Sequence, residues 1–208
     1  MPQRESEQDA RRLHPEGQSV HQRDLVRLAS GTPVSMLPHQ IWLVVRGLVK
    51  LTTITSQGDL LVLGLAGPNQ VFGALFTSLD VYGAVALGPV ELIGLTLDDL
   101  RFNPVWATEL LPAMANRLRQ SEALITLLGL RRVEERLRGL LELLASDYGQ
   151  PCELGLKLEL RLTHQDLASA LCTSRVTITR LLGSLRDQGW LQPAGRHQLV
   201  IPHLAGRC

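Results

Sequence analysis

Aromatic residues are scarce in this 208-residue chain, at 4% of the total, and cysteine occurs three times, at Cys152, Cys172 and Cys208. The cysteines form no CxxC pair, which excludes the usual zinc and iron–sulfur patterns. We therefore expect reduced thiols, no metal, no cofactor and a core built mainly from aliphatic side chains. No Ser/His/Asp or paired-carboxylate pattern is present either, so we expect no enzyme.

Long hydrophobic runs are absent as well, so the sequence predicts no membrane span. Residues 1–17 are polar and charged, which is unlike a secretory signal and predicts a disordered tail on a cytoplasmic protein. The net charge is only +1, but residues 1–130 hold 10 Lys and Arg against 12 Asp and Glu, whereas residues 131–208 hold 11 against 8. Any DNA contact is therefore expected in the C-terminal part.

Between residues 41 and 97 the chain is rich in aliphatic and β-branched residues, in short segments separated by turns that contain glycine or proline. Short strands at such spacing favour an antiparallel barrel or sandwich. We predict an α+β protein in which residues 18–105 form a shortened, jelly-roll-like antiparallel β-barrel of the effector-binding type. The expected strands are residues 41–45, 48–55, 60–65, 71–76, 81–87 and 90–95.

The periodicity then changes from strand to helix. Over residues 106–130, side chains recur alternately three and four residues apart in a narrow heptad stripe with one polar layer. Such a stripe packs well against a copy of itself and predicts a dimerisation helix; a helix docked on its own barrel is the alternative. Pro112 fits a first helical turn, so we expect the helix to begin just before it. The predicted dimer contacts are Leu111, Met114, Leu118, Ser121, Ile125 and Leu128.

Residues 131–208 have the pattern of a winged helix-turn-helix. A helix is expected over residues 133–148, with Gly149 as its stop, and the alternating leucines of residues 153–162 indicate a strand pair with a turn at Gly155.

A short helix is expected after Thr163, because Thr163 can cap it and Asp166 stands three residues further on. Residues 172–174 interrupt this helix, and Thr173 or Ser174 would cap a second one. The second helix has one apolar face, formed by Ile178, Leu181, Leu182 and Leu185.

A hairpin is expected after the second helix, which Gly189 ends. Arg196 and His197 stand near its tip, where they are placed for phosphates, although a turn that merely closes the domain is the alternative.

The opposite face of the second helix has the chemistry of a DNA-recognition helix. Arg175 and Arg180 can reach guanine O6 and N7, and Val176 and Thr179 can touch thymine methyl groups. An ordinary helix pair with a solvated basic face is the alternative, which the caps, the turn and the small Ala168 at the helix crossing argue against. The candidate DNA contacts are Thr163, His164, Gln165, Ser174, Arg175, Val176, Thr177, Thr179, Arg180 and Arg196.

The order of barrel, long helix and winged helix-turn-helix, with Thr-Ser-Arg-Val-Thr-Ile-Thr-Arg at residues 173–180, resembles the family of the cyclic-AMP receptor protein and the fumarate–nitrate regulator (Crp/Fnr). The resemblance implies a homodimer that binds two-fold symmetric operators and acts as an activator by recruiting RNA polymerase. It assigns base reading to Arg175 and Arg180. A ligand-sensing barrel that acts through protein partners, with a degenerate DNA module, is the alternative; the presence of both arginines argues against it.

Further segments are most similar to the cyanobacterial branch of this family, which regulates nitrogen and sulfur nutrition. The implied targets are therefore genes for nutrient assimilation or transport, and sulfur and nitrogen both stay open. The segments that carry this similarity are residues 41–51, 71–75, 88–93 and 119–125.

The residues that bind cyclic AMP in the family are changed here. The family pattern is Phe-Gly-Glu followed by an arginine for the phosphate, whereas Ala74 follows Phe72 and Gly73, and Asp80 stands near the expected arginine. A cyclic phosphate would meet a carboxylate and no cation, so we predict that cyclic AMP does not bind.

By the same resemblance, Arg117 and Glu122 match helix positions that contact 2-oxoglutarate in the nitrogen regulator, but the barrel arginine of that site is absent. We favour a surface or interhelical ion pair for these two side chains. The effector therefore stays unassigned, and the candidate effector pocket comprises Phe72, Gly73, Leu75, Arg117, Ser121 and Glu122.

Cys172 stands where the family's helix-turn-helix turn usually has glycine. Glycine tolerates a positive φ at little cost, so we expect a mildly strained turn. A small buried residue without redox function is the favoured interpretation of this cysteine, and redox control is the alternative.

Overall fold

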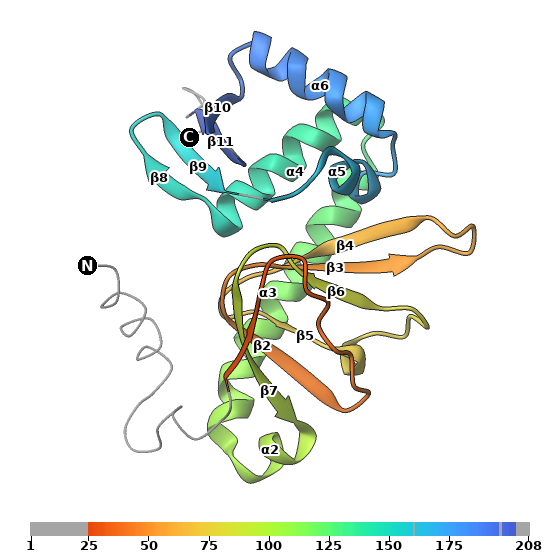
Figure 1. Ribbon diagram of the computed structural model, residues 1–208, viewed down its shortest axis with the longest axis vertical. Helices are drawn as coiled ribbons and strands as arrows, with labels where there is room; N and C mark the ends of the chain where they lie inside the picture. Colours follow the sequence, from red (N-terminus) through yellow and green to blue (C-terminus); the bar gives the residue numbers. More distant parts are fainter. Residues whose placement is uncertain (1–24, 160, 196, 203–208) are drawn as a thin grey trace. The chain divides into compact units, whose positions relative to one another are not determined.

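The computed structural model describes residues 25–159, 161–195 and 197–202 (Figure 1). The predicted tail, residues 1–17, and Arg196 lie outside these residues. The chain packs as two compact units. Of the described residues, the first unit comprises 25–49, 66–80 and 84–117, and the second comprises 50–65, 81–83, 118–159, 161–195 and 197–202.

The first unit contains a four-stranded sheet with the order β1-β7-β2-β5. Its neighbouring strands are antiparallel, as predicted for the N-terminal part. One layer of buried aliphatic side chains, including Ile41, Leu43 and Leu95, packs against Leu110 and Ala113 of the following long helix. The strands are β1 (Leu25–Leu28), β2 (Gln40–Arg46), β5 (Val71–Phe72) and β7 (Val90–Thr96).

Two details of this unit differ from the sequence prediction. The strand expected over residues 71–76 ends at Phe72, and the 3₁₀ helix η2 (Ala74–Phe76) follows. The chain turns there because the Phe76 N–H donates to the Gly73 carbonyl at 3.1 Å, which closes the first turn of η2. At Gly73 a Cβ atom would lie 2.5 Å from the carbonyl oxygen of Gln40, so only glycine fits. The short strand β1 and the helix α2 (Leu97–Phe102) were not predicted.

The long helix α3 (Pro104–Leu128) begins well before Pro112, so the predicted start was wrong. The Asn103 side-chain oxygen accepts a hydrogen bond from the Val105 backbone N–H, and Pro104 occupies the first helical position, where proline needs no hydrogen-bond partner. Pro112 lies inside the helix. Pro112 is thus compatible with a first helical turn but does not lie in one.

A second sheet has the strand order β4-β3-β6, formed by β3 (Val49–Ile54), β4 (Leu60–Ala66) and β6 (Gly83–Ala86). The buried amide of Gln120 in α3 holds β4, because its oxygen accepts from the Leu65 N–H at 3.1 Å. The Tyr148 hydroxyl donates to the Leu65 carbonyl at 3.1 Å and accepts from the Gln120 amide nitrogen at 2.8 Å. Both backbone polar groups of Leu65 are therefore satisfied by side chains from helices.

The C-terminal part follows the predicted order of a helix, a strand pair, two short helices and a hairpin. Its four strands form one sheet with the order β10-β11-β9-β8. The elements are α4 (Val133–Tyr148), β8 (Gln150–Cys152), β9 (Gly155–Glu159), α5 (His164–Ala170), α6 (Arg175–Asp187), β10 (Gln192–Gly195) and β11 (Gln198–Pro202).

Arg138 in α4 contacts side chains at and after the end of α6. It forms an ion pair with Glu134 at 2.9 Å, donates to the Gln188 side chain after α6, and its guanidinium lies 5.0 Å from the ring centroid of Trp190. A cation over an indole face is a favourable contact, so Arg138 anchors the end of α6 to α4. No helix in the described part of the chain is long and apolar enough to cross a lipid bilayer.

Candidate DNA-binding interface

Helix α5 begins with the capping box that the sequence predicts. The Thr163 hydroxyl accepts from the Asp166 N–H at 3.1 Å, and one carboxylate oxygen of Asp166 accepts from the Thr163 N–H at 2.9 Å and from its hydroxyl at 2.8 Å. These contacts fix where α5 starts.

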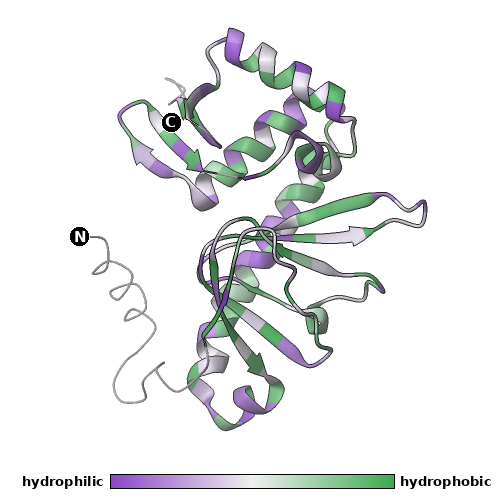
Figure 2. Cartoon of the chain, in the orientation of Figure 1, coloured by the Kyte–Doolittle hydropathy of each residue, from purple (hydrophilic) through white to green (hydrophobic). Residues whose placement is uncertain are grey.

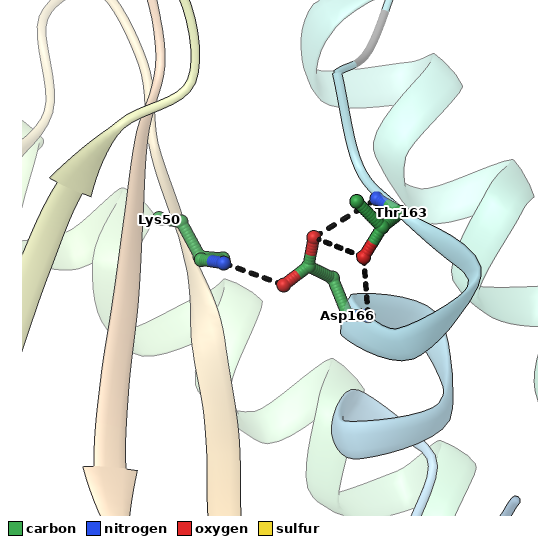
Figure 3. Close-up of polar contacts among 3 residues, drawn as sticks. All are labelled: Lys50, Thr163 and Asp166. Carbon is green, nitrogen blue, oxygen red and sulfur yellow. Dashed lines mark hydrogen bonds and ion pairs between the residues drawn. The ribbon is translucent and has the colours of Figure 1, made fainter. Parts of the chain in front are cut away.

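The other carboxylate oxygen of Asp166 accepts from the Lys50 ammonium of β3 at 2.5 Å (Figure 3). Burial by itself raises the pKa of the Asp166 carboxyl. The Lys50 ammonium and the Thr163 donors outweigh that effect, so the pKa lies below its ordinary value of 3.8. The carboxylate is therefore charged and fully hydrogen-bonded at neutral pH.

The turn between α5 and α6 has the strained geometry expected at Cys172. This residue has a φ of 51°, in the left-handed region that glycine adopts most readily. Its side chain is exposed, so the expectation of a buried cysteine was wrong; the turn places this residue at the surface. The Thr173 N–H donates to the Ala168 carbonyl at 3.0 Å, and the Arg136 guanidinium donates to the Leu171 carbonyl at 3.4 Å. Backbone hydrogen bonds and α4 thus hold the turn despite its strain.

Ser174 is the residue that caps α6, because its hydroxyl accepts from the Thr177 N–H at 3.1 Å. The predicted apolar face is confirmed, and Figure 2 shows hydrophobic and hydrophilic segments alternating along the helix. The opposite face is exposed at Arg175, Val176, Thr179 and Arg180.

Val176 is 78% exposed, so its methyl groups are accessible at the surface of α6. Among the residues that the structure describes, Arg175 and Arg180 form no ion pair. Two cations and one apolar side chain are therefore available for contact along one exposed face of α6.

A hydrogen bond joins α5 to the exposed face of α6. The Thr179 hydroxyl donates to the Arg175 carbonyl at 2.9 Å, and His164 Nδ1 lies 2.8 Å from the same hydroxyl oxygen. Because the single hydroxyl proton is used toward Arg175, Nδ1 of His164 must be the donor in its contact with Thr179. His164 thus orients Thr179 on the exposed face.

The expected wing is the β10–β11 hairpin. Gly189, with a φ of 70°, follows α6, and His197, with a φ of 64°, lies in the turn between the two strands. Gln198 in β11 donates to the Glu159 carboxylate of β9 at 3.2 Å, which connects the wing to the sheet. The position of Arg196, the predicted wing contact, lies outside the described residues.

The structure brings the predicted DNA contacts of α5 and α6 together around one turn. The predicted dimer stripe on α3 exposes large side chains at Leu111 (70%), Leu118 (61%) and Ile125 (69%). In the candidate effector pocket, Phe72 is 1% exposed, Gly73 has no room for a side chain, and Glu122 is exposed on α3. The pocket stays a prediction.

Lys50 is the residue that sequence reasoning missed. It precedes Asp166 by 116 residues and stands in a strand that the sequence placed in the barrel. A lysine at a strand position carries no local sign of a distant carboxylate partner, and no signal in one sequence could have paired the two.

A pair of capped helices joined by a strained turn, with a hairpin after the second helix, defines a winged helix-turn-helix. The family model of the Crp-like helix-turn-helix domain matches residues 135–206.

Curated relatives cover a larger part of the chain. The global nitrogen regulator of Nostoc sp. is 35% identical over 158 residues, which are 72% of this chain and 71% of that protein. The regulatory protein CysR of Synechococcus elongatus is 35% identical over 163 residues, 77% of this chain and 75% of that protein.

Among solved structures, a CRP/FNR-family transcriptional regulator from Thermus thermophilus has a TM-score of 0.67 and 25% identity, and the match covers 86% of this chain and 93% of that one. The chain belongs to the Crp/Fnr family of transcription regulators. It is therefore a regulator rather than an enzyme.

Proposed function

We propose that this protein is a homodimer that binds a two-fold symmetric DNA operator and regulates transcription of nutrient-assimilation or transport genes. The exposed face of α6, with Arg175, Val176, Thr179 and Arg180, is the observation that carries the proposal. The two arginines form no ion pair with any described residue, and an exposed valine lies next to them. The arginines can donate to the guanine acceptors of a major groove, and the valine can contact thymine methyl groups.

The two roles of the interface residues differ. Arg175 and Arg180 read bases, with Val176 and Thr179 against thymine methyl groups, whereas Gln165, Ser174 and Thr177 lie at the two helix starts and hold phosphates. The N–H and the hydroxyl of Thr163 both donate to Asp166, so Thr163 supports the start of α5 instead. Lys or Arg contacts to phosphate would add affinity that falls with salt concentration, but only base contacts give sequence preference.

The target genes follow from the relatives. One relative is named a global nitrogen regulator, and another is the regulatory protein CysR. We infer that this chain regulates nitrogen or sulfur nutrition, with RNA polymerase as its partner at activated promoters. Mapping the genomic fragments that the protein binds tests this assignment, and binding sites confined to genes outside nutrition would contradict it.

The DNA-reading proposal is tested by fluorescence anisotropy with an operator selected from random DNA. Arg180→Ala should weaken binding to the operator by about 1–3 kcal/mol, the range for a bidentate base contact, and should change binding to random DNA far less. Arg186→Ala is the matched control, because Arg186 is an exposed arginine in the last turn of the same helix. Equal binding of operator and random DNA by the wild-type protein would refute sequence-specific reading.

A further inference from the structure

The carboxylate of Asp166 is charged although its side chain is only 8% exposed. A buried carboxylate needs both hydrogen bonds and a compensating cation. Thr163 supplies two of the hydrogen bonds to this carboxylate, but Lys50 supplies the cation. The start of α5 therefore depends on a side chain outside the helix-turn-helix (Figure 3).

Lys50 is itself held away from solvent. Its side chain is 15% exposed, and it extends from β3, the central strand of the β4-β3-β6 sheet. The neighbouring strand β4 is fixed at Leu65 by Gln120 of α3 and Tyr148 of α4. The ammonium thus comes from a strand whose sheet is anchored, not from a freely moving surface lysine.

We propose that Lys50 is a positioning residue for DNA binding: its ion pair with Asp166 sets the start of α5, and the operator affinity depends on β3 through this contact. The inference rests on the proposed DNA-binding function. Lys50 acts through Asp166 and the capping box, because the carboxylate that accepts from Lys50 also accepts from the Thr163 N–H and hydroxyl at the start of α5.

A positioning role and a direct phosphate contact make different predictions. A lysine that neutralises a phosphate contributes about 0.9 to the slope of log affinity against log salt concentration. The charge of Lys50 is already compensated by Asp166. Removing the Lys50 ammonium should therefore weaken operator binding without changing that slope.

The experiment measures operator affinity and its salt slope for the full-length protein and its variants. Lys50→Met should weaken operator binding roughly tenfold, within the range seen for residues that couple to a site without touching the ligand, and leave the salt slope unchanged. Lys50→Arg keeps the cation and should retain most of the affinity. Arg27→Met, which breaks the exposed Arg27–Glu91 ion pair, is the matched control and should bind like the wild type.

A second variant separates the proposed route from general destabilisation. Asp166→Asn keeps an oxygen for the Thr163 N–H, so it should tolerate the loss of the cation, and Lys50→Met should then have little additional effect on affinity. Wild-type affinity in a folded Lys50→Met protein would overturn the proposal. The proposal would also be overturned if Lys50→Met weakened operator binding equally in the wild-type and the Asp166→Asn proteins. A salt slope reduced by about one in Lys50→Met would overturn it as well, because it would indicate a direct phosphate contact. If the wild-type protein shows no operator preference, the proposed function fails instead.

Discussion

The hydroxyl group of Thr179 limits what this side chain can offer to a base. Its proton is donated to the Arg175 carbonyl, and one lone pair faces the His164 ring nitrogen. It cannot then donate to guanine O6 or to a purine N7 without breaking a bond inside the protein. The group left for the major groove is the methyl group.

Two substitutions at Thr179 test this restriction. Thr179→Val keeps a methyl group in the same place and should leave operator affinity close to that of the wild type. Thr179→Ser keeps the hydroxyl but loses the methyl group and should weaken binding by roughly 0.8 kcal/mol, the value of one buried methylene. Anisotropy titrations measure both, and a serine variant that binds better than the valine variant would contradict the methyl contact.

The low pKa of Asp166 predicts a pH dependence of stability. The folded-state pKa lies below 3.8, the value for the unfolded chain. The ionised carboxylate therefore stabilises the folded protein at pH values above the unfolded-state pKa. This contribution should disappear as the pH falls below 3.8 through the folded-state pKa. Thermal unfolding of the wild type and Asp166→Asn should therefore differ most near neutral pH and converge in acid. A difference that grows in acid would contradict the assignment.

At the scale of elements, the turn between α5 and α6 stores strain at Cys172. A non-glycine residue in the left-handed region costs about 1–2 kcal/mol, and glycine loses about 0.5–1 kcal/mol through chain entropy. Cys172→Gly should therefore increase the free energy of unfolding by up to about 1 kcal/mol in urea titrations, and Cys172→Val should decrease it because a β-branched residue adopts this conformation poorly.

Gly183 in α6 provides a comparison for that measurement. A Cβ atom there would meet nothing within 4 Å, so Gly183→Ala should stabilise α6 by roughly 0.5–1 kcal/mol through helix propensity alone. A Cys172→Gly variant less stable than the wild type, beside a stabilised Gly183→Ala variant, would show that the turn is not strained.

Elements with local signals were predictable from the sequence. Helix α4, the caps at Thr163 and Ser174, and the buried face of α6 follow from residue periodicity and cap chemistry within a few positions. The start of α3 was not predictable, because Pro104 and Pro112 both satisfy the rule for a first turn. The requirement for glycine at position 73, next to the Gln40 carbonyl, also follows only from the packed sheet.

The candidate site likewise contains features that the sequence predicts and contacts that it does not. The exposed face of α6 could be predicted from spacing alone, since every residue on it lies within two helical turns. The His164–Thr179 hydrogen bond and the Lys50–Asp166 ion pair could not, because they depend on how separate elements pack.

At the scale of the whole molecule, the exposed stripe on α3 predicts the oligomeric state. Leu118 is 61% exposed in the single chain, and leucines this exposed at heptad spacing indicate a partner helix. Leu118→Glu should yield monomers in sedimentation velocity and abolish operator binding, because one subunit contacts only half of a two-fold operator.

Asn116→Glu is the control for the dimer prediction. Asn116 is exposed and two residues away, on the other side of the helix, so it should leave the dimer intact. A Leu118→Glu protein that sediments as a dimer would move the interface away from this stripe.

The ion pair between β3 and α5 bears on the exchange of parts between related regulators. A chimera that joins this helix-turn-helix to another regulator's N-terminal part would cover the Asp166 carboxylate without supplying its cation. We expect such chimeras to fold and bind DNA only when the other regulator's sheet has a basic residue at the position of Lys50. On this proposal, DNA binding requires β3 as well as the helix-turn-helix.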